Sequence, residues 1–270
     1  MRTIFHFPCF GVAFCALALL CGAPLAQAAE AVLLRFAYET KDVPPYFIGD
    51  GEQIPAKPGV TPELMRLLET KIPGLKVQLQ RMPWKRCLSS LQSGESDAVV
   101  ASFNKERRSL GHYPMKGEAP DPALRIDTKA YFLYSHVKSK ISWNGRQFSG
   151  VNGAIGAPLG YSIVEDLKNQ GLAVEESKSA QQLLEKLSLQ RVAAVALLER
   201  VGDALLQDGA YPHILKHPAP LAGKDYYVLL SQTFVSKYPA MARQIWQAVA
   251  QLREQEGEAL IKQYLALPGE

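Results

Sequence analysis

The feature that most constrains the fold is an alternation between two hydrophobic patterns along residues 31–230. Apolar runs with the length of a strand alternate with longer segments in which apolar residues recur every three or four positions, as on one face of a helix. Strands are predicted at 33–38, 76–82, 97–103, 130–136, 151–157, 192–198 and 225–230. Because the intervening segments are helical, the alternation predicts an α/β fold in which helices cover a sheet.

Helix ends are predicted from capping residues and glycines. Thr61, which is followed by proline, is predicted to cap one helix, and Ser162 begins the capping box Ser-Ile-Val-Glu of another. Apolar residues within 84–91 follow the spacing i, i+3, i+4 and i+7, and Gly94 is predicted to end that helix. Residues 236–267 are predicted to be largely helical.

The N-terminus has the pattern of a secretory signal peptide. Arg2 is the only formal charge before Glu30, and an apolar stretch at 9–20 lies between them. The sequence Ala-Gln-Ala that ends at Ala28 is a typical cleavage site, whereas a membrane-spanning helix would need about 20 apolar residues. A lipoprotein signal at Cys21 is the alternative, but a leucine precedes this cysteine where a small residue is expected. We predict cleavage after Ala28 and export to the periplasm.

Composition narrows what the exported part can be. Cys87 is the only cysteine in residues 29–270, so no internal disulfide can form and the core must hold the fold. This cysteine lies on the apolar face of its predicted helix, which favours inert packing over a reactive thiol. The net charge of +4 is modest, and no basic run with interleaved aromatic residues suggests a nucleic-acid partner. No second long apolar segment follows the signal peptide, which predicts a soluble protein.

The sequence carries no complete catalytic or metal-binding motif. Residues 160–164 read Gly-Tyr-Ser-Ile-Val and lack the second glycine of a nucleophile elbow. Glycines at 150, 153 and 156 match neither a dinucleotide fingerprint nor a phosphate-binding loop. The five histidines are scattered, without a pair at metal-ligand spacing. Catalytic residues, metals and cofactors are therefore not predicted.

Three positions have features of a binding site instead. Residues 156–160 read Gly-Ala-Pro-Leu-Gly and lead into the helix predicted at Ser162, whose N-terminal N–H groups can hold a carboxylate. The alternative is an ordinary turn in which Ser162 caps only its own helix. Arg107 follows the strand predicted at 97–103, although such a charged stretch is also typical of a solvated loop. Trp84 follows another predicted strand, where the alternative is a place in the core.

These motifs, in this order, resemble the family-3 periplasmic solute-binding proteins, which are the polar amino-acid receptors of ABC importers. The resemblance rests on blocks at 44–46, 59–63, 83–98, 102–107 and 156–162 and covers nearly the whole of residues 29–270. It implies a two-lobed periplasmic-binding-protein fold of type II, with two crossover strands that form a hinge.

The resemblance also assigns site residues. It implies that Arg107 clamps the ligand carboxylate with its planar guanidinium and that Ser102 adds a hydrogen bond. It places Trp84 against the ligand's side chain and Tyr46 at the same mouth. The second lobe would cover the ligand with Gly160, Tyr161 and Ser162.

One position departs from the family pattern. Amino-acid receptors of this family usually place an aspartate after the strand equivalent to 192–198, where it binds the ligand's ammonium. Leu198 aligns with that aspartate, and the acidic Glu199 stands next to it. Since successive side chains of a strand face opposite sides, Glu199 is predicted to point away from the cleft. Val43 also replaces an aromatic residue that stacks on many ligands. A ligand without an α-ammonium is therefore favoured over a standard amino acid.

The predicted organisation has four parts. These are a signal peptide at 1–28, a first lobe at 29–132, a second lobe at 133–227 and a return to the first lobe at 228–270. The hinge is expected to run through 130–136 and 225–230.

The predicted function is capture of a small, polar, carboxylate-bearing ligand, an amino acid or an analogue, by a monomeric protein for ABC-type uptake. An ABC permease or a membrane receptor is the expected protein partner. One alternative is a sensory protein that signals to such a receptor. Another is an enzyme similar to the periplasmic cyclohexadienyl dehydratases, which share the fold and need an acid in the cleft, such as Glu39 or Glu199.

Overall fold

The computed structural model describes residues 31–207 and 209–266, together with residues 1, 3 and 6. The predicted signal peptide therefore lies almost entirely outside the described residues. Among those that are described, no helix is long and apolar enough to cross a membrane.

Seven of the eight main strands overlap strands that the sequence predicts, and β10 is the one that was not predicted. The main strands are β1 (Val32–Tyr38), β2 (Leu75–Arg81), β3 (Ala98–Ser102), β6 (Asp127–His136), β9 (Ile155–Pro158), β10 (Val174–Ser177), β11 (Ala194–Leu198) and β12 (Ile214–Leu230). Two short hairpins pair β4 (Met115–Lys116) with β5 (Ala119–Pro120) and β7 (Ser142–Trp143) with β8 (Phe148–Ser149). The α-helices are α1 (Val60–Lys71), α2 (Trp84–Ser93), α3 (Ser162–Asn169), α4 (Ala180–Ser188), α5 (Glu199–Gln207), α6 (Gln232–Lys237), α7 (Pro239–Leu252) and α8 (Glu258–Leu265). Short 3-10 helices lie at Glu106–Ser109 and Pro122–Leu124, and a π-helical turn at Arg253–Gly257 joins α7 to α8.

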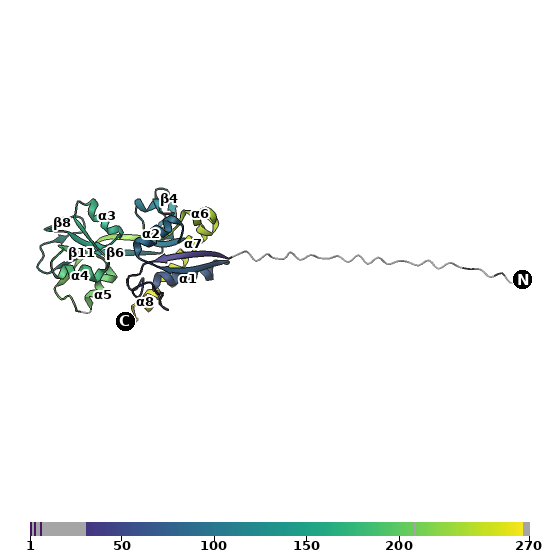
Figure 1. Cartoon of the computed structure of the whole chain (residues 1–270), viewed down its shortest axis with the longest axis horizontal. Helices are drawn as coiled ribbons and strands as arrows, with labels where there is room; N and C mark the ends of the chain where they lie inside the picture. Colours follow the sequence, from purple (N-terminus) through teal and green to yellow (C-terminus); the bar gives the residue numbers. More distant parts are fainter. Residues whose placement is uncertain (2, 4–5, 7–30, 208, 267–270) are drawn as a thin grey trace. The chain divides into compact units, whose positions relative to one another are not determined.

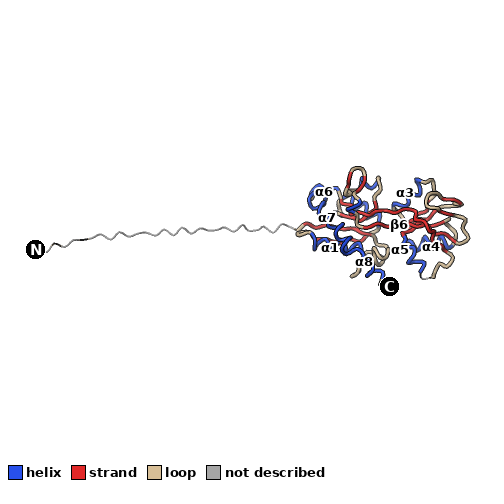
Figure 2. Tube along the Cα trace, turned by 180° about the vertical axis from the view of Figure 1, so that it is seen from behind, coloured by secondary structure: helices blue, strands red, loops and turns tan. Residues whose placement is uncertain are grey.

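In the described part of the chain, the main strands form one sheet with two parallel halves. The strand order is β10-β9-β11-β6-β12-β3-β1-β2. Strands β1, β2 and β3 are mutually parallel, as are β9, β10 and β11, whereas β6 and β12 run antiparallel to each other and to their outer neighbours. Figure 1 shows α3, α4 and α5 around the β11 half and α1, α2, α6 and α7 around the other, and Figure 2 shows the reverse side. We call the half with β1–β3 the first lobe and the half with β9–β11 the second lobe.

Both lobes cover their strands with helices on two faces. In β1, Leu34, Phe36 and Tyr38 pack in the same cluster as Leu68 of α1, whereas Ala37 packs with α2. Strand β11 alternates in the same way, because Val195 and Leu197 pack against Leu183, Leu184 and Leu187 of α4 while the residues between them face the other side. Each fully buried leucine contributes roughly 1.5–3 kcal/mol to stability. Burial on both faces explains why β11 is a continuous apolar run.

Helix α2 was predicted correctly at both ends. It begins at Trp84, and Gly94 follows it in the left-handed conformation with φ of +79°. Cys87 is fully buried on its inner face, and burial raises the pKa of the thiol to about 12. The predicted role of Cys87 as inert packing fits this environment, because a thiol that keeps its proton is a poor nucleophile.

Two predicted helix caps are wrong. Helix α1 begins at Val60 and is preceded by Gly59, so Thr61 is a buried residue inside the helix. Gly59 is required there because its φ is +111° and a Cβ would lie 2.3 Å from the carbonyl oxygen of Tyr46. Ser162 is the first residue of α3 rather than its cap, because its hydroxyl is bonded to Ser102 instead of to its own helix.

Strand β12 is much longer than the predicted strand at 225–230. It starts at Ile214, pairs with β6 through Tyr226 and then pairs with β3 from Tyr226 to Leu230. The register with β6 shifts between Lys216 and Ala222, around Pro220. Proline cannot donate to a neighbouring strand, so it weakens the strand signal in the sequence and is found at such irregularities.

Candidate functional site

The predicted ligand-binding residues gather at the carboxyl ends of the parallel strands of both lobes. Glu39 follows β1, and Ser102 is the last residue of β3. Tyr161 follows β9 by a short turn, and Leu198 is the last residue of β11. In open α/β sheets, ligands bind outside the carboxyl ends of the strands.

Arg107 lies at the centre of this arrangement. It belongs to the 3-10 helix Glu106–Ser109 and is only 7% exposed. Its Nη1 donates to the carbonyl oxygen and Oγ of Ser102 at 3.0 and 3.1 Å, and its Nη2 donates to the carbonyl oxygen of Gly160 at 3.0 Å. The guanidinium also lies 5.6 Å from the ring centre of Trp84. These contacts fix a planar cation between the two lobes.

Further hydrogen bonds join the lobes around Arg107. The hydroxyls of Ser102 and Ser162 are 2.7 Å apart, and Trp84 Nε1 donates to the carbonyl oxygen of Gly160 at 3.2 Å. Tyr113 Oη donates to the carbonyl oxygen of Ser102 at 2.9 Å and holds the end of β3 in place. Arg107 and Trp84 of the first lobe thus both donate hydrogen bonds to the carbonyl oxygen of Gly160 in the second lobe.

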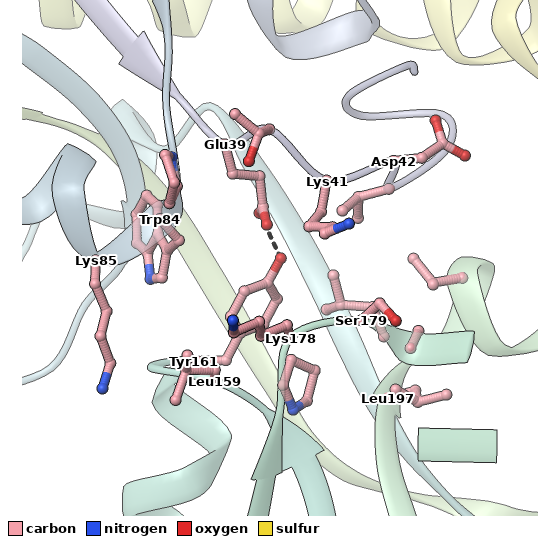
Figure 3. Close-up of a pocket in the computed structure, with 17 residues that line it drawn as sticks. Glu39, Lys41, Asp42, Trp84, Lys85, Leu159, Tyr161, Lys178, Ser179 and Leu197 are labelled. Carbon is pink, nitrogen blue, oxygen red and sulfur yellow. Dashed lines mark hydrogen bonds between the residues drawn. The ribbon is translucent and has the colours of Figure 1, made fainter. Parts of the chain in front are cut away.

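Glu39 is a buried carboxylic acid at the same junction. Tyr161 Oη of the second lobe donates a hydrogen bond to its Oε1, as Figure 3 shows. Burial raises the pKa of Glu39 to about 7, although the hydrogen bond from Tyr161 and the charge of Lys129 act in the opposite direction. A carboxyl group in this environment changes its charge near neutral pH.

Lys129 is a residue of the site that sequence reasoning missed. It lies on β6, is 5% exposed and places Nζ 3.4 Å from the ring centre of Tyr46 and 4.6 Å from that of Tyr226. The carboxylate of Asp127 lies 3.9 Å away, beyond hydrogen-bonding distance. Burial lowers the pKa of Lys129 to about 8. The signal available in the sequence was a lysine directly before the apolar run at 130–136.

Two adjoining cavities lie between these residues. The inner cavity measures about 30 Å³ and is lined by Arg107, Ser102 and Lys129 among others. The outer cavity measures about 240 Å³ and extends toward Leu159, Leu197 and Val201 of the second lobe. Figure 3 shows Trp84, Tyr161 and Lys41 around the outer cavity. Both cavities share Glu39, Val43, Trp84, Tyr161 and Leu198 as lining residues.

The remaining predicted residues lie outside these cavities or at their edge. Tyr46 is buried, with its ring against Lys129, and does not line either cavity. Glu199 starts α5, and its Oε1 accepts a hydrogen bond from Lys216 at 2.7 Å, whereas Leu198 lines both cavities. This is the orientation expected for neighbouring residues at a strand end.

Two N–H groups of the turn before α3 are hydrogen-bonded within the protein. The N–H of Gly160 donates to Oε2 of Glu176 at 2.8 Å, and that of Tyr161 donates to the carbonyl oxygen of Pro158 at 3.1 Å. A side-chain carboxylate from β10 therefore accepts from Gly160, and the binding of a ligand carboxylate by the N-terminal N–H groups of α3 stays a prediction. In residues 31–207 and 209–266 no cluster of three potential metal ligands is found.

Comparison with known proteins shows the fold. Neither a family model nor a curated protein matches this sequence. A histidine kinase sensor domain with similarity to periplasmic binding proteins matches with a TM-score of 0.67 and 15% identity, over 89% of this chain and 99% of the other. The ligand-binding core of GluR0 from Nostoc punctiforme, in complex with L-glutamate, matches with a TM-score of 0.64 and 16% identity, over 87% and 99%.

A third neighbour is an amino acid ABC transporter substrate-binding protein, AbpA from Streptococcus pneumoniae, bound to L-arginine. It matches with a TM-score of 0.61 and 18% identity, over 86% of this chain and 94% of the other. The chain therefore has the two-lobed α/β fold of periplasmic binding proteins, and the resemblance noted in the sequence is confirmed at the level of the fold.

Proposed function

We propose that this protein is an exported solute-binding protein that closes two lobes over a small carboxylate-bearing ligand, an amino acid or an analogue, for ABC-type uptake. The observation that carries the proposal is the buried guanidinium of Arg107, which lines the inner cavity and donates across the lobe junction to Gly160. A planar cation with several donors matches a carboxylate. The neighbours GluR0 and AbpA, whose structures hold amino acids, support a solute-binding role.

The hydrogen bond from Arg107 to the carbonyl oxygen of Gly160 suggests how the two lobes would close over a ligand. On this proposal, a ligand carboxylate accepts from Arg107 in place of the carbonyl oxygen of Gly160, and the lobes then meet through the ligand. The first lobe comprises residues 29–132 and 228–270, and the second lobe comprises residues 133–227. The hinge lies in β6 and β12. A few residues in two strands suffice for such a domain closure.

A thermal-shift screen of the exported protein tests the proposal. Amino acids, oligopeptides and organic acids are added one at a time, and the unfolding temperature is recorded. A ligand at about 100 times its Kd should add roughly 2.7 kcal/mol to the free energy of unfolding. Absence of any stabilising compound across these classes would contradict a solute-binding role.

A sensory role is the second candidate, because one structural neighbour is a histidine kinase sensor domain. In that case the closed lobes would dock on a membrane receptor instead of a permease. Co-purification of the liganded protein with membrane proteins of its native cell separates the two, since each role requires a different partner.

An enzymatic role rests on Glu39, a buried acid with a pKa of about 7 that lines both cavities. Acids with such pKa values are found at catalytic sites, but also in structural networks. The structural neighbours named above are binding or sensor domains, so we favour binding without turnover. Chromatography of each ligand after incubation with the protein should return it unchanged.

The export part of the proposal is tested separately. The motivation is the cleavage pattern that ends at Ala28. Intact-mass measurement of protein from a Gram-negative periplasm should give a chain that begins at Ala29 and carries no lipid. A diacylglyceryl group on Cys21, or a chain that still begins at Met1, would contradict it.

A further inference from the structure

The inner cavity offers little to hold an ammonium group. Its charged lining residues are Arg107, Lys129 and Glu39, which are two cations and one carboxylate. Glu39 already accepts the hydroxyl of Tyr161, and the charge of Lys129 acts on it. Leu198, at the end of β11, lines both cavities with an aliphatic side chain. An α-ammonium here would therefore share its single carboxylate with a buried lysine, and burial of a poorly paired charge is costly.

The outer cavity is suited to an apolar body. Val43 and Trp84 of the first lobe and Leu159, Leu198 and Val201 of the second line it. Lys85 and Lys178, which also line it, are exposed, and the side chain of Lys41 is 44% exposed, so these ammonium groups reach water rather than a buried ligand. Its volume of about 240 Å³ exceeds the roughly 150 Å³ of an apolar cavity that holds benzene. A six-membered ring or a branched chain therefore fits.

The two cavities adjoin, so one ligand can reach both. Five residues line both cavities, and the hydrogen bond between Tyr161 and Glu39 lies among them. A ligand anchored at Arg107 can therefore extend past this hydrogen bond into the outer cavity. The outer cavity accounts for most of the volume, so the ligand body decides much of the specificity.

We infer that the ligand is a carboxylic acid with an apolar body and without an α-ammonium, such as an arylalkanoic or branched 2-oxo acid. Its carboxylate binds Arg107 in the inner cavity, and its body fills the outer cavity. This inference rests on the proposed function and names the class of ligand for the same site.

Calorimetry with matched compounds tests the inference. The probes are 3-phenylpropanoate against phenylalanine, 4-methyl-2-oxopentanoate against leucine, and propanoate as an acid without a body. We expect each acid to bind at least tenfold more tightly than its amino acid, and 3-phenylpropanoate at least tenfold more tightly than propanoate.

The failures of the inference and of the proposed function are distinguishable. Tighter binding of the amino acids, or of polar amino acids alone, overturns the inference while the solute-binding function stands. If none of the three acids binds but the screen finds another stabilising compound, the inference is likewise overturned and the solute-binding function stands. If no compound of any class binds, both proposals are wrong.

Two variants locate the ligand within the cavities. Ala180→Trp fills part of the outer cavity from the start of α4. It should weaken 3-phenylpropanoate at least tenfold and leave propanoate within about twofold. Gln181→Trp is the matched control, because the next residue of the same helix is exposed and does not line the cavity. Unchanged binding of 3-phenylpropanoate by Ala180→Trp would overturn the inference.

The second variant, Leu198→Asp, supplies the missing carboxylate. It should shift the ratio of affinities at least tenfold toward phenylalanine over 3-phenylpropanoate, whereas the neutral Leu198→Asn should not. Melting curves identify any loss of folding at this buried position, and in that event Ala180→Trp decides alone. An unchanged ratio in folded Leu198→Asp would overturn the inference that the site lacks an α-ammonium partner because Leu198 lines it.

Discussion

The two sides of the cleft recognise a ligand by different chemistry. The first-lobe side carries the buried charges that line the inner cavity, namely Arg107, Glu39 and, on β6, Lys129. The second-lobe side supplies the carbonyl oxygen of Gly160, the hydroxyls of Tyr161 and Ser162, and aliphatic side chains. Charge acts over several ångströms, whereas hydrogen bonds and apolar contacts require direct contact. The difference implies that a ligand is first held by the charged side and that the neutral side then responds to its shape.

The largest expected effect comes from removing the charge that anchors the ligand. Arg107→Ala should weaken binding by about 2–5 kcal/mol, the range for loss of one partner of a buried charge pair. Calorimetry with the best compound from the screen measures the change. Arg108→Ala is the control, because that guanidinium lies 49% exposed and 3.7 Å from Glu118. Equal affinity of the Arg107 variant and wild type would place the anchor elsewhere.

A smaller effect concerns the acid that joins the two sides. Glu39 has a folded-state pKa raised to about 7, so the folded protein keeps a proton that the unfolded chain loses near its ordinary pKa. The free energy of unfolding should then fall by ~1–3 kcal/mol as the pH rises from about 4.5 to 7. Thermal melts of wild type against Glu39→Gln, compared between pH 5 and 7.5, isolate this contribution because both share all other titrating groups.

Tyr161→Phe sharpens the same measurement. The hydroxyl of Tyr161 lowers the pKa of Glu39, so its removal should raise that pKa further and extend the fall in stability to higher pH. The pH range stops at 7.5 because Lys129 titrates from about 8 with the opposite sign. A wild-type profile parallel to that of Glu39→Gln would show that Glu39 is ionised throughout.

The hydroxyl pair that bridges the sides should give a third, smaller effect. A double-mutant cycle of Ser102→Ala and Ser162→Ala is expected to show a coupling of about 0.5–1.5 kcal/mol in ligand affinity. The pair Ser142 and Ser149 is a matched control, since its hydroxyls are also 2.7 Å apart but lie on the exposed β7–β8 hairpin. Additive losses from the cleft serines would mean that they do not act together.

The smallest effect is expected just outside the cleft. Glu199→Gln should change affinity by less than about 1 kcal/mol, because its carboxylate is 41% exposed and pairs with Lys216. Calorimetry on the folded variant checks this. A loss above tenfold, about 1.4 kcal/mol, together with a preference for α-amino acids over deaminated analogues, would make Glu199 the partner of a ligand ammonium.

The sequence predicted those features that depend on neighbouring residues. The start of α2 at Trp84 and its end at Gly94 follow from local periodicity and from the conformational freedom of glycine. Arg107 and Ser102 contact each other and stand in one short block with a recognisable order, so their proximity follows from the sequence, whereas their role in binding a ligand stays a prediction.

Features that depend on distant residues were missed. The environment of Lys129 is built from Tyr46 and Tyr226, which are far from it in sequence. Ser162 looked like a helix cap because its partner Ser102 lies sixty positions away. The hydrogen bond from the N–H of Gly160 to Glu176 was not predicted, because Glu176 lies on another strand. Local patterns carry no information on such pairings.

The length of β12 has a consequence for how the protein unfolds. This one strand is hydrogen-bonded to β6 near the second lobe and to β3 in the first lobe. It therefore joins the strands of the two lobes into one continuous sheet. Loss of the second-lobe strands would leave the side of β6 that pairs with β11 unpaired at the edge of the surviving sheet, which is unfavourable. The lobes that recognise a ligand separately should therefore melt together, in a single cooperative calorimetric transition.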